Sequence, residues 1–114
     1  MSRDLSFWKT DKNTECDNRH IYCSLSNEEY LPFIDEIPII KIQQDINEVF
    51  KAWKNHNNRY YENEREAFEL MLTKQFFRAD CYNMTNKSMN DIIDVLNKYD
   101  CPLYDSAIDV RFDD

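Results

Sequence analysis

The chain of 114 residues contains no glycine. Glycine adopts positive φ angles most readily because it has no Cβ atom. Its absence excludes a glycine-rich phosphate-binding loop, a dinucleotide-binding fingerprint and the Gly-x-Ser-x-Gly elbow of hydrolases, since each needs an unobstructed backbone. Left-handed turn positions must then be filled by Asn or Asp, which tolerate this conformation best after glycine. The runs at residues 55–58 and 83–86 suit such turns.

The size and composition of the chain predict one folded domain. Single domains commonly contain about 100 to 150 residues. Hydrophobic residues make up 42% of the sequence and aromatic residues 14%, which is enough to build a core and too much for a disordered chain. We therefore expect a single α+β domain that spans residues 1–114.

The charge of the chain is strongly acidic. Asp and Glu number 22 against 14 Lys and Arg, which gives a formal net charge of −8. Direct binding to nucleic acid is disfavoured, because phosphate contacts need clustered basic side chains. The negative field would attract basic proteins. A role in solubility alone explains the same charge, so both interpretations stay open at this stage.

Cytoplasmic localisation is the default expectation. The N-terminus leads into no apolar segment typical of a secretory signal, and no apolar stretch approaches the roughly 20 residues that span a bilayer. The four cysteines, Cys16, Cys23, Cys81 and Cys101, are not spaced like those of a disulfide-rich secreted scaffold. We expect them to be free thiols, and a monomer is the default oligomeric state.

Two segments have the apolar spacing of amphipathic helices. After Pro38, a residue suited to the start of a helix, one apolar face is formed by Ile39, Ile42, Ile46, Val49, Phe50 and Trp53. The second helix is predicted over residues 88–99, with Ser88 and Asp91 as a capping box. A shorter helix capped by Asp17 precedes an ordered loop at residues 27–38.

Alternating apolar and polar residues predict an antiparallel sheet. The pattern is clearest over residues 66–73 and 76–82, and shorter strands are expected over 5–10, 59–62, 103–104 and 108–112. A sheet of about four to five strands packed against the two main helices gives a two-layer α+β fold. The opposite sheet face would carry Glu69, Thr73, Arg78 and Asp80, and we expect the binding surface there or in the loops.

No complete catalytic, metal or cofactor motif is present. Cys16, His20 and Cys23 offer soft metal ligands, but the paired Cys-x2-Cys units of zinc sites are missing. His20 and His56 lie in polar stretches and are read as solvated side chains, not as bases for a cysteine nucleophile. A general acid must be desolvated to raise its pKa, whereas acidic pairs such as Asp35 and Glu36 are expected to stay solvated. We predict no enzyme, no cofactor and no metal.

Four segments resemble a family of small bacterial cytoplasmic proteins. They are Ser6-Phe7-Trp8-Lys9, Asp35-Glu36-Ile37-Pro38, Thr73-Lys74-Gln75-Phe76-Phe77-Arg78-Ala79-Asp80-Cys81-Tyr82 and Cys101-Pro102-Leu103-Tyr104-Asp105. In size and acidity these proteins are similar to immunity proteins of polymorphic-toxin and contact-dependent growth inhibition systems. The chain departs from the pattern at Asn83 and Asp100, where glycine would be expected.

This resemblance implies that the chain neutralises a protein toxin. An acidic, aromatic surface would dock on a basic, nuclease-like toxin domain and occlude its active site. The candidate contact residues are Tyr60, Tyr61, Glu62, Glu64, Glu66, Asp105, Asp109 and Asp113. The alternatives are a phage-type inhibitor or nucleic-acid mimic, whose carboxylates would lie along a ridge, a small enzyme, and a plain adaptor.

Overall fold

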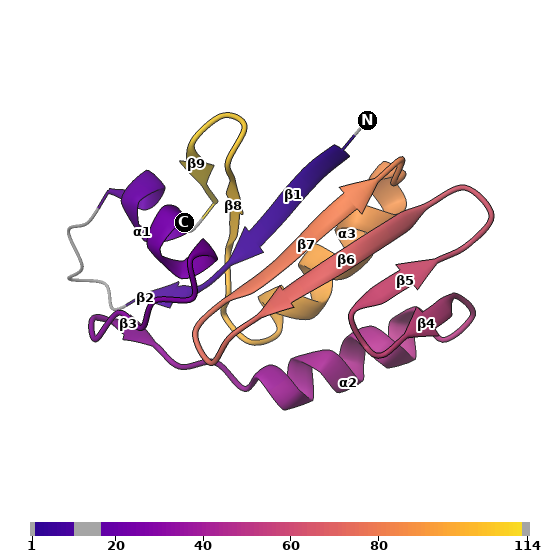
Figure 1. The fold of residues 1–114 in the computed structure, drawn as a ribbon, viewed down its shortest axis with the longest axis horizontal. Helices are drawn as coiled ribbons and strands as arrows, with labels where there is room; N and C mark the ends of the chain where they lie inside the picture. Colours follow the sequence, from indigo (N-terminus) through magenta and orange to yellow (C-terminus); the bar gives the residue numbers. More distant parts are fainter. Residues whose placement is uncertain (1, 11–16, 113–114) are drawn as a thin grey trace.

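The computed structural model describes residues 2–10 and 17–112 (Figure 1). The helices are α1 (Asn18–Ser26), α2 (Ile39–Val49) and α3 (Asn86–Asn97). The strands are β1 (Ser2–Phe7), β2 (Lys9–Thr10), β3 (Ile34–Asp35), β4 (Lys54–His56), β5 (Tyr60–Glu62), β6 (Ala67–Leu72), β7 (Phe77–Tyr82), β8 (Leu103–Asp105) and β9 (Val110–Arg111). The α+β class predicted from the sequence is confirmed.

Seven of the strands form one sheet in the order β4-β5-β6-β7-β1-β8-β9, and each neighbouring pair is antiparallel. The prediction of four to five strands was therefore too low. It missed β4, because the apolar helix stripe continues to Trp53 although α2 ends at Val49. The predicted first strand is also divided, since β2 leaves the large sheet and pairs with β3.

Asparagine and aspartate occupy the tight turns, as the lack of glycine requires. Asn57 and Asn58 have φ angles of 57° and 59° and connect β4 to β5. The Arg59 N–H donates to the His56 carbonyl at 3.1 Å, so the two asparagines are the central residues of a tight turn, where positive φ matches the twist of the strands. Asn83, Asp100 and Asp109 also have positive φ angles. Among the described residues only Glu28 shares this conformation without being Asn or Asp.

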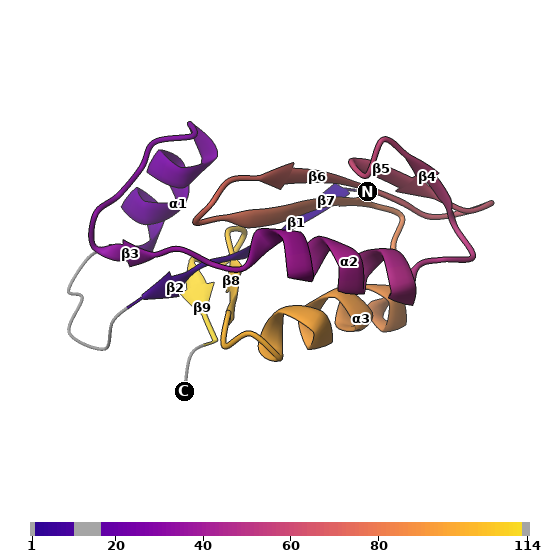
Figure 2. The same ribbon diagram turned by 90° about the horizontal axis from the view of Figure 1, so that it is seen from below.

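The main core lies between one face of the sheet and the two longer helices (Figure 2). Leu5, Phe7, Phe68 and Phe77 point from the strands into this core. The helices contribute Ile42, Ile46, Phe50, Ile92, Val95 and Leu96. Successive strand residues point to opposite faces, so Asp4, Glu69, Arg78 and Asp80 are directed to the other side. That orientation was predicted for the last three.

A second, smaller core forms on the opposite side of the sheet beneath α1. Ile21 and Leu25 of α1 pack with Trp8, Phe76 and Tyr104, which point away from the main core. Figure 2 shows α1 on one side of the sheet and α2 with α3 on the other. Helices thus lie on both sides, in contrast to the predicted two-layer arrangement, because these aromatic side chains also need cover.

Two local predictions need correction. The N-cap of α3 is Thr85, whose side chain accepts a hydrogen bond from the Ser88 N–H, so Ser88 and Asp91 do not form a capping box. The predicted loop at residues 27–38 contains β3 and is attached to the sheet by Gln75, which is buried in the tight turn between β6 and β7.

Over residues 2–10 and 17–112, no helix combines the length and apolar character that crossing a membrane requires.

Candidate functional site

Part of the sheet face opposite α2 and α3 is left without a helix. In Figure 2, α1 lies over one end of this face, while β5 and β6 have no described helix on that side. We call the residues that project here the acidic face, namely Asp4, Tyr60, Glu62, Glu69, Asp80 and Tyr82. The face combines four carboxylates with two tyrosines and belongs to the surface that the strand alternation predicted as a binding surface.

The strand register aligns three carboxylates across the acidic face. Glu69 lies opposite Asp80, and Asp80 lies opposite Asp4. On the neighbouring strand β5, Tyr60 lies opposite Glu69. Residues paired across antiparallel strands have Cα atoms about 5 Å apart, so the three acidic residues form a row about 10 Å long. Like charges in such positions repel each other and destabilise the sheet.

Two carboxylates of the row are held by neighbours. Arg78 forms an ion pair with Asp80, with 3.1 Å between Nε and Oδ1, and also donates to Ser26 of α1. Asp4 accepts hydrogen bonds from the Tyr22 hydroxyl and, at 2.6 Å, from the Ser106 hydroxyl. These two carboxylates therefore also attach α1 and the β8–β9 turn to the sheet.

Glu69 differs from the other two acidic residues of the row. Its side chain is exposed, and it forms no ion pair or hydrogen bond with the residues that the structure describes. Its charge therefore faces solvent next to two further carboxylates. Of the three, Glu69 is the group that an external cation could reach and neutralise.

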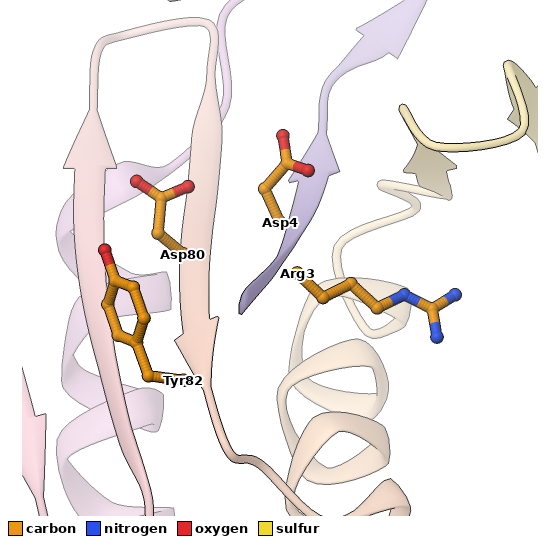
Figure 3. Close-up of a pocket in the computed structure, with 4 residues that line it drawn as sticks. All are labelled: Arg3, Asp4, Asp80 and Tyr82. Atoms are coloured by element: carbon orange, nitrogen blue, oxygen red, sulfur yellow. The ribbon is translucent and has the colours of Figure 1, made fainter. Parts of the chain in front are cut away.

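A shallow hollow of about 200 Å³ lies at the end of the row, lined by Arg3, Asp4, Asp80 and Tyr82. Figure 3 shows the Arg3 side chain extending away from the other three residues. Tyr82 is 40% exposed, and its pKa is raised by partial burial and then by the charges of Asp80 and Glu69. The hollow therefore offers an aromatic ring in a negative potential.

The predicted contact residues on β5 and the following turn have different environments. Tyr60 is half-buried on the acidic face beside His56, which contacts Glu62 at 2.9 Å. Glu64 is exposed in the turn. Tyr61, by contrast, is completely buried, and its hydroxyl is held by Gln43 and Asn47. It points into the main core and is not available as an anchor for a partner.

Glu66 serves a structural role in the same turn. Its carboxylate accepts hydrogen bonds from the Thr85 N–H at 2.8 Å and from the Asn63 side chain at 3.0 Å. Partial burial acts to raise the pKa of Glu66, but these hydrogen bonds outweigh it and lower the pKa below its usual value. Glu66 thus connects the β5–β6 turn to the start of α3.

The predicted acidic group near the C-terminus does not form one exposed patch. Asp105 is 2% exposed and forms an ion pair with Arg3. Asp109 is exposed and accepts a hydrogen bond from the Tyr104 hydroxyl at 2.7 Å. Asp113 lies outside the described residues. Because β6, β7 and β1 stand between β5 and β8, Asp105 of β8 is separated from Glu62 of β5 by about 19 Å across the sheet.

The geometry offers little to the metal and nucleophile alternatives. His20 and Cys23 are exposed on α1, and Cys16 lies outside the described residues. No cluster of metal-ligating side chains occurs within residues 2–10 and 17–112. Burial raises the pKa of Cys81 to about 12 and that of Cys101 to about 11, so both thiols stay protonated at neutral pH. A protonated thiol is a poor nucleophile and metal ligand.

Asp4 is the member of the acidic face that the sequence did not indicate. It lies before the predicted start of the first strand, whereas β1 begins at Ser2. The alternation of Asp4 and Ser6 with buried Leu5 and Phe7 is the signal that extends the strand.

Comparison of the sequence with models of known protein families finds no match, and comparison with curated proteins finds none either. The functional argument therefore depends on the surface itself.

Proposed function

We propose that this chain is an immunity-type binding protein, which neutralises a basic, nuclease-like toxin domain by docking on it through the acidic face. The observation that carries the proposal is the row of Glu69, Asp80 and Asp4 with Glu69 exposed and unpaired. Aligned carboxylates repel each other, and no contact within the described residues explains the exposed charge of Glu69. A basic partner surface would relieve this repulsion on binding.

The residues around the row fit the composition of protein interfaces. Tyr60 and Tyr82 flank the carboxylates, and tyrosine is enriched at interfaces because it has a large rigid ring and a polar end. The flat strand surface of β5, β6 and β7 is suited to cover an active site by contact over its area. Complementary charge would accelerate the encounter with the toxin, and the tyrosines would slow release.

The spacing of the acids favours this role over nucleic-acid mimicry. A mimic that fills a nucleic-acid channel needs carboxylates along an extended ridge. The row is only about 10 Å long, and Arg78 interrupts the negative surface beside it. A compact patch of this kind fits a local cluster of Lys and Arg on a protein.

The test measures binding to purified basic, nuclease-like toxin domains of polymorphic-toxin and contact-dependent growth inhibition systems. Glu69→Lys reverses the unpaired charge, whereas Glu48→Lys makes the same change on α2, on the opposite side of the sheet. We expect the Glu69→Lys variant to associate about tenfold more slowly at low salt, and the Glu48→Lys variant to bind like the wild type. Equal association rates for the two variants, or no complex with the wild type, would overturn the proposal.

A further inference from the structure

The helix layer is narrower than the sheet that it covers. Seven strands about 4.8 Å apart span about 29 Å, whereas two adjacent helices about 10 Å in diameter cover about 20 Å. Helices α2 and α3 contact each other and pack on the strands from β5 to β1. In Figure 2, β8 and β9 have no described helix on the side of α3. The layer thus lacks the width of one helix.

A groove lies where this third helix would be. Two adjoining hollows of about 570 and 280 Å³ share Arg3, Asn86 and Met89 as lining residues. They extend along the first turns of α3 and face the β8–β9 hairpin. Their apolar lining includes Met84, Met89, Ile93, Leu103, Ile108 and Phe112.

The apolar side chains of the hairpin are unusually exposed. Ile108 is 60% exposed and Phe112 is 52% exposed. Phe112 follows β9 directly, and its N–H donates to the Leu103 carbonyl at 2.8 Å, so it continues the strand and projects to the same face as Val110. Covering side chains of this size stabilises a complex by about 25 cal/mol for each Å² of apolar surface removed from water. The groove is therefore a surface that gains from a partner.

The polar groups on the floor of the groove are already paired. Asp105 forms an ion pair with Arg3 and accepts a hydrogen bond from the Ala107 N–H at 3.0 Å. These groups do not call for a charged ligand at the centre. The ligand that fits has an apolar strip for the groove and polar groups only at its sides.

The charges at the sides indicate which partner fits. Asp94 is exposed and follows Asn90 by one turn at the solvent side of α3. Asp109, in contrast, accepts a hydrogen bond from the Tyr104 hydroxyl and is directed to the opposite side of the sheet. A second copy of this chain would bring together two molecules of charge −8. A basic partner would instead be attracted by Asp94 and by the negative charge of the whole chain.

We propose that the groove binds a cationic amphipathic helix of a partner protein, which completes the helix layer beside α3. The apolar stripe of this helix covers Met89, Ile108 and Phe112, and its Lys or Arg side chains lie near Asp94. The groove follows α3 from Asn86 to Ile93, about 12 Å along the helix axis, so a helical segment of about two turns matches it. The inference concerns the opposite side of the sheet from the acidic face and does not depend on the proposed function.

The test follows the methyl signals of the full chain by NMR while a synthetic helical peptide of Leu and Lys is added. A scrambled peptide of the same composition and a Leu–Glu helix are the peptide controls. We expect saturable shifts at Met84, Met89, Ile93 and Ile108 with the Leu–Lys helix, and at least tenfold weaker binding of both controls. Shifts at Met71, on the other side of the sheet, in place of the groove would overturn the inference.

Substitutions at exposed positions separate the groove from other apolar surface. The double variant Ile108→Asn and Phe112→Asn is expected to lower the affinity for the Leu–Lys helix at least tenfold. Ile40→Asn on α2 is the matched control, because Ile40 is 72% exposed and lies outside the groove. Unchanged affinity in the double variant contradicts the inference. Analytical sedimentation gives a second test. A dimeric wild-type chain and a monomeric double variant would also contradict the inference.

Discussion

Replacing Glu69 with Gln should make the folded chain more stable. Glu69 lies opposite Asp80, and Asp80 lies opposite Asp4, so the substitution removes one of three aligned negative charges. Gln keeps the size and the hydrogen-bonding capacity of the side chain. The change in the free energy of unfolding then reports the repulsion within the row.

The size of the effect follows from the geometry. Two unit charges about 5 Å apart in water repel each other by about 0.8 kcal/mol, and salt at physiological strength screens part of this energy. The ion pair of Arg78 with Asp80 also offsets some of the repulsion. We expect Glu69→Gln to raise the free energy of unfolding by about 0.3–0.8 kcal/mol at low salt. For a domain of this size the melting temperature rises by about 2–4 °C.

Urea denaturation at low and high ionic strength is the assay. In about 1 M salt the Debye length falls to about 3 Å, so the gain should disappear. Glu48→Gln is the matched control, because it makes the same change of charge where the neighbour is the cation Lys51, with 3.3 Å between Nζ and Oε1. No gain for Glu69→Gln, an equal gain for Glu48→Gln, or a gain that persists in high salt would refute the reasoning.

Three further substitutions test how the turns and loops are held. Gln75→Leu should lower the free energy of unfolding by about 2–4 kcal/mol, because the backbone groups of Leu31 and Ile34 lose their hydrogen bonds. A urea denaturation midpoint close to that of the wild type would contradict this prediction. Asp100 has a φ angle of 58° after α3, a conformation that glycine adopts without strain and alanine does not. Asp100→Gly should therefore raise the melting temperature by about 2–6 °C, and Asp100→Ala should lower it. A calorimetric melting temperature that is higher for the Ala variant than for the Gly variant would contradict this. Glu66 has a folded pKa below the usual 4.5, so its stabilisation is present above that pH and is lost as the pH falls through the folded pKa. The stability difference between wild type and Glu66→Gln should therefore shrink below about pH 4.5 in acid titrations, and a difference independent of pH contradicts the assignment.

Much of the fold follows from local patterns in the sequence. The apolar stripe after Pro38 and the alternation over residues 66–73 and 76–82 correspond to α2, β6 and β7. Most of the turn chemistry was also predictable, since in a chain without glycine Asn and Asp tolerate positive φ best, although Glu28 adopts it as well. These features depend on residues close to each other in the chain.

The acidic face was only partly predictable, because it depends on pairing between distant residues. The alternation in β6 and β7 assigns Glu69 and Asp80 to one face, but the register that adds Asp4 joins β1 to β7. Tyr60 and Tyr61 are equivalent in composition, and their opposite orientations follow only from which of them faces the helices. Asp105 is buried because Arg3, far away in the sequence, reaches it.

The orientation of the partner on the chain can be measured directly. Amide hydrogen exchange of the chain, alone and mixed with a basic toxin domain that it binds, compares the two faces of the sheet and its helices in one experiment. Binding through the acidic face predicts slower exchange in β5, β6 and β7 around Tyr60, Glu69 and Tyr82, with α2 unchanged. Slower exchange confined to the helix side, or none in β6 and β7, would contradict it.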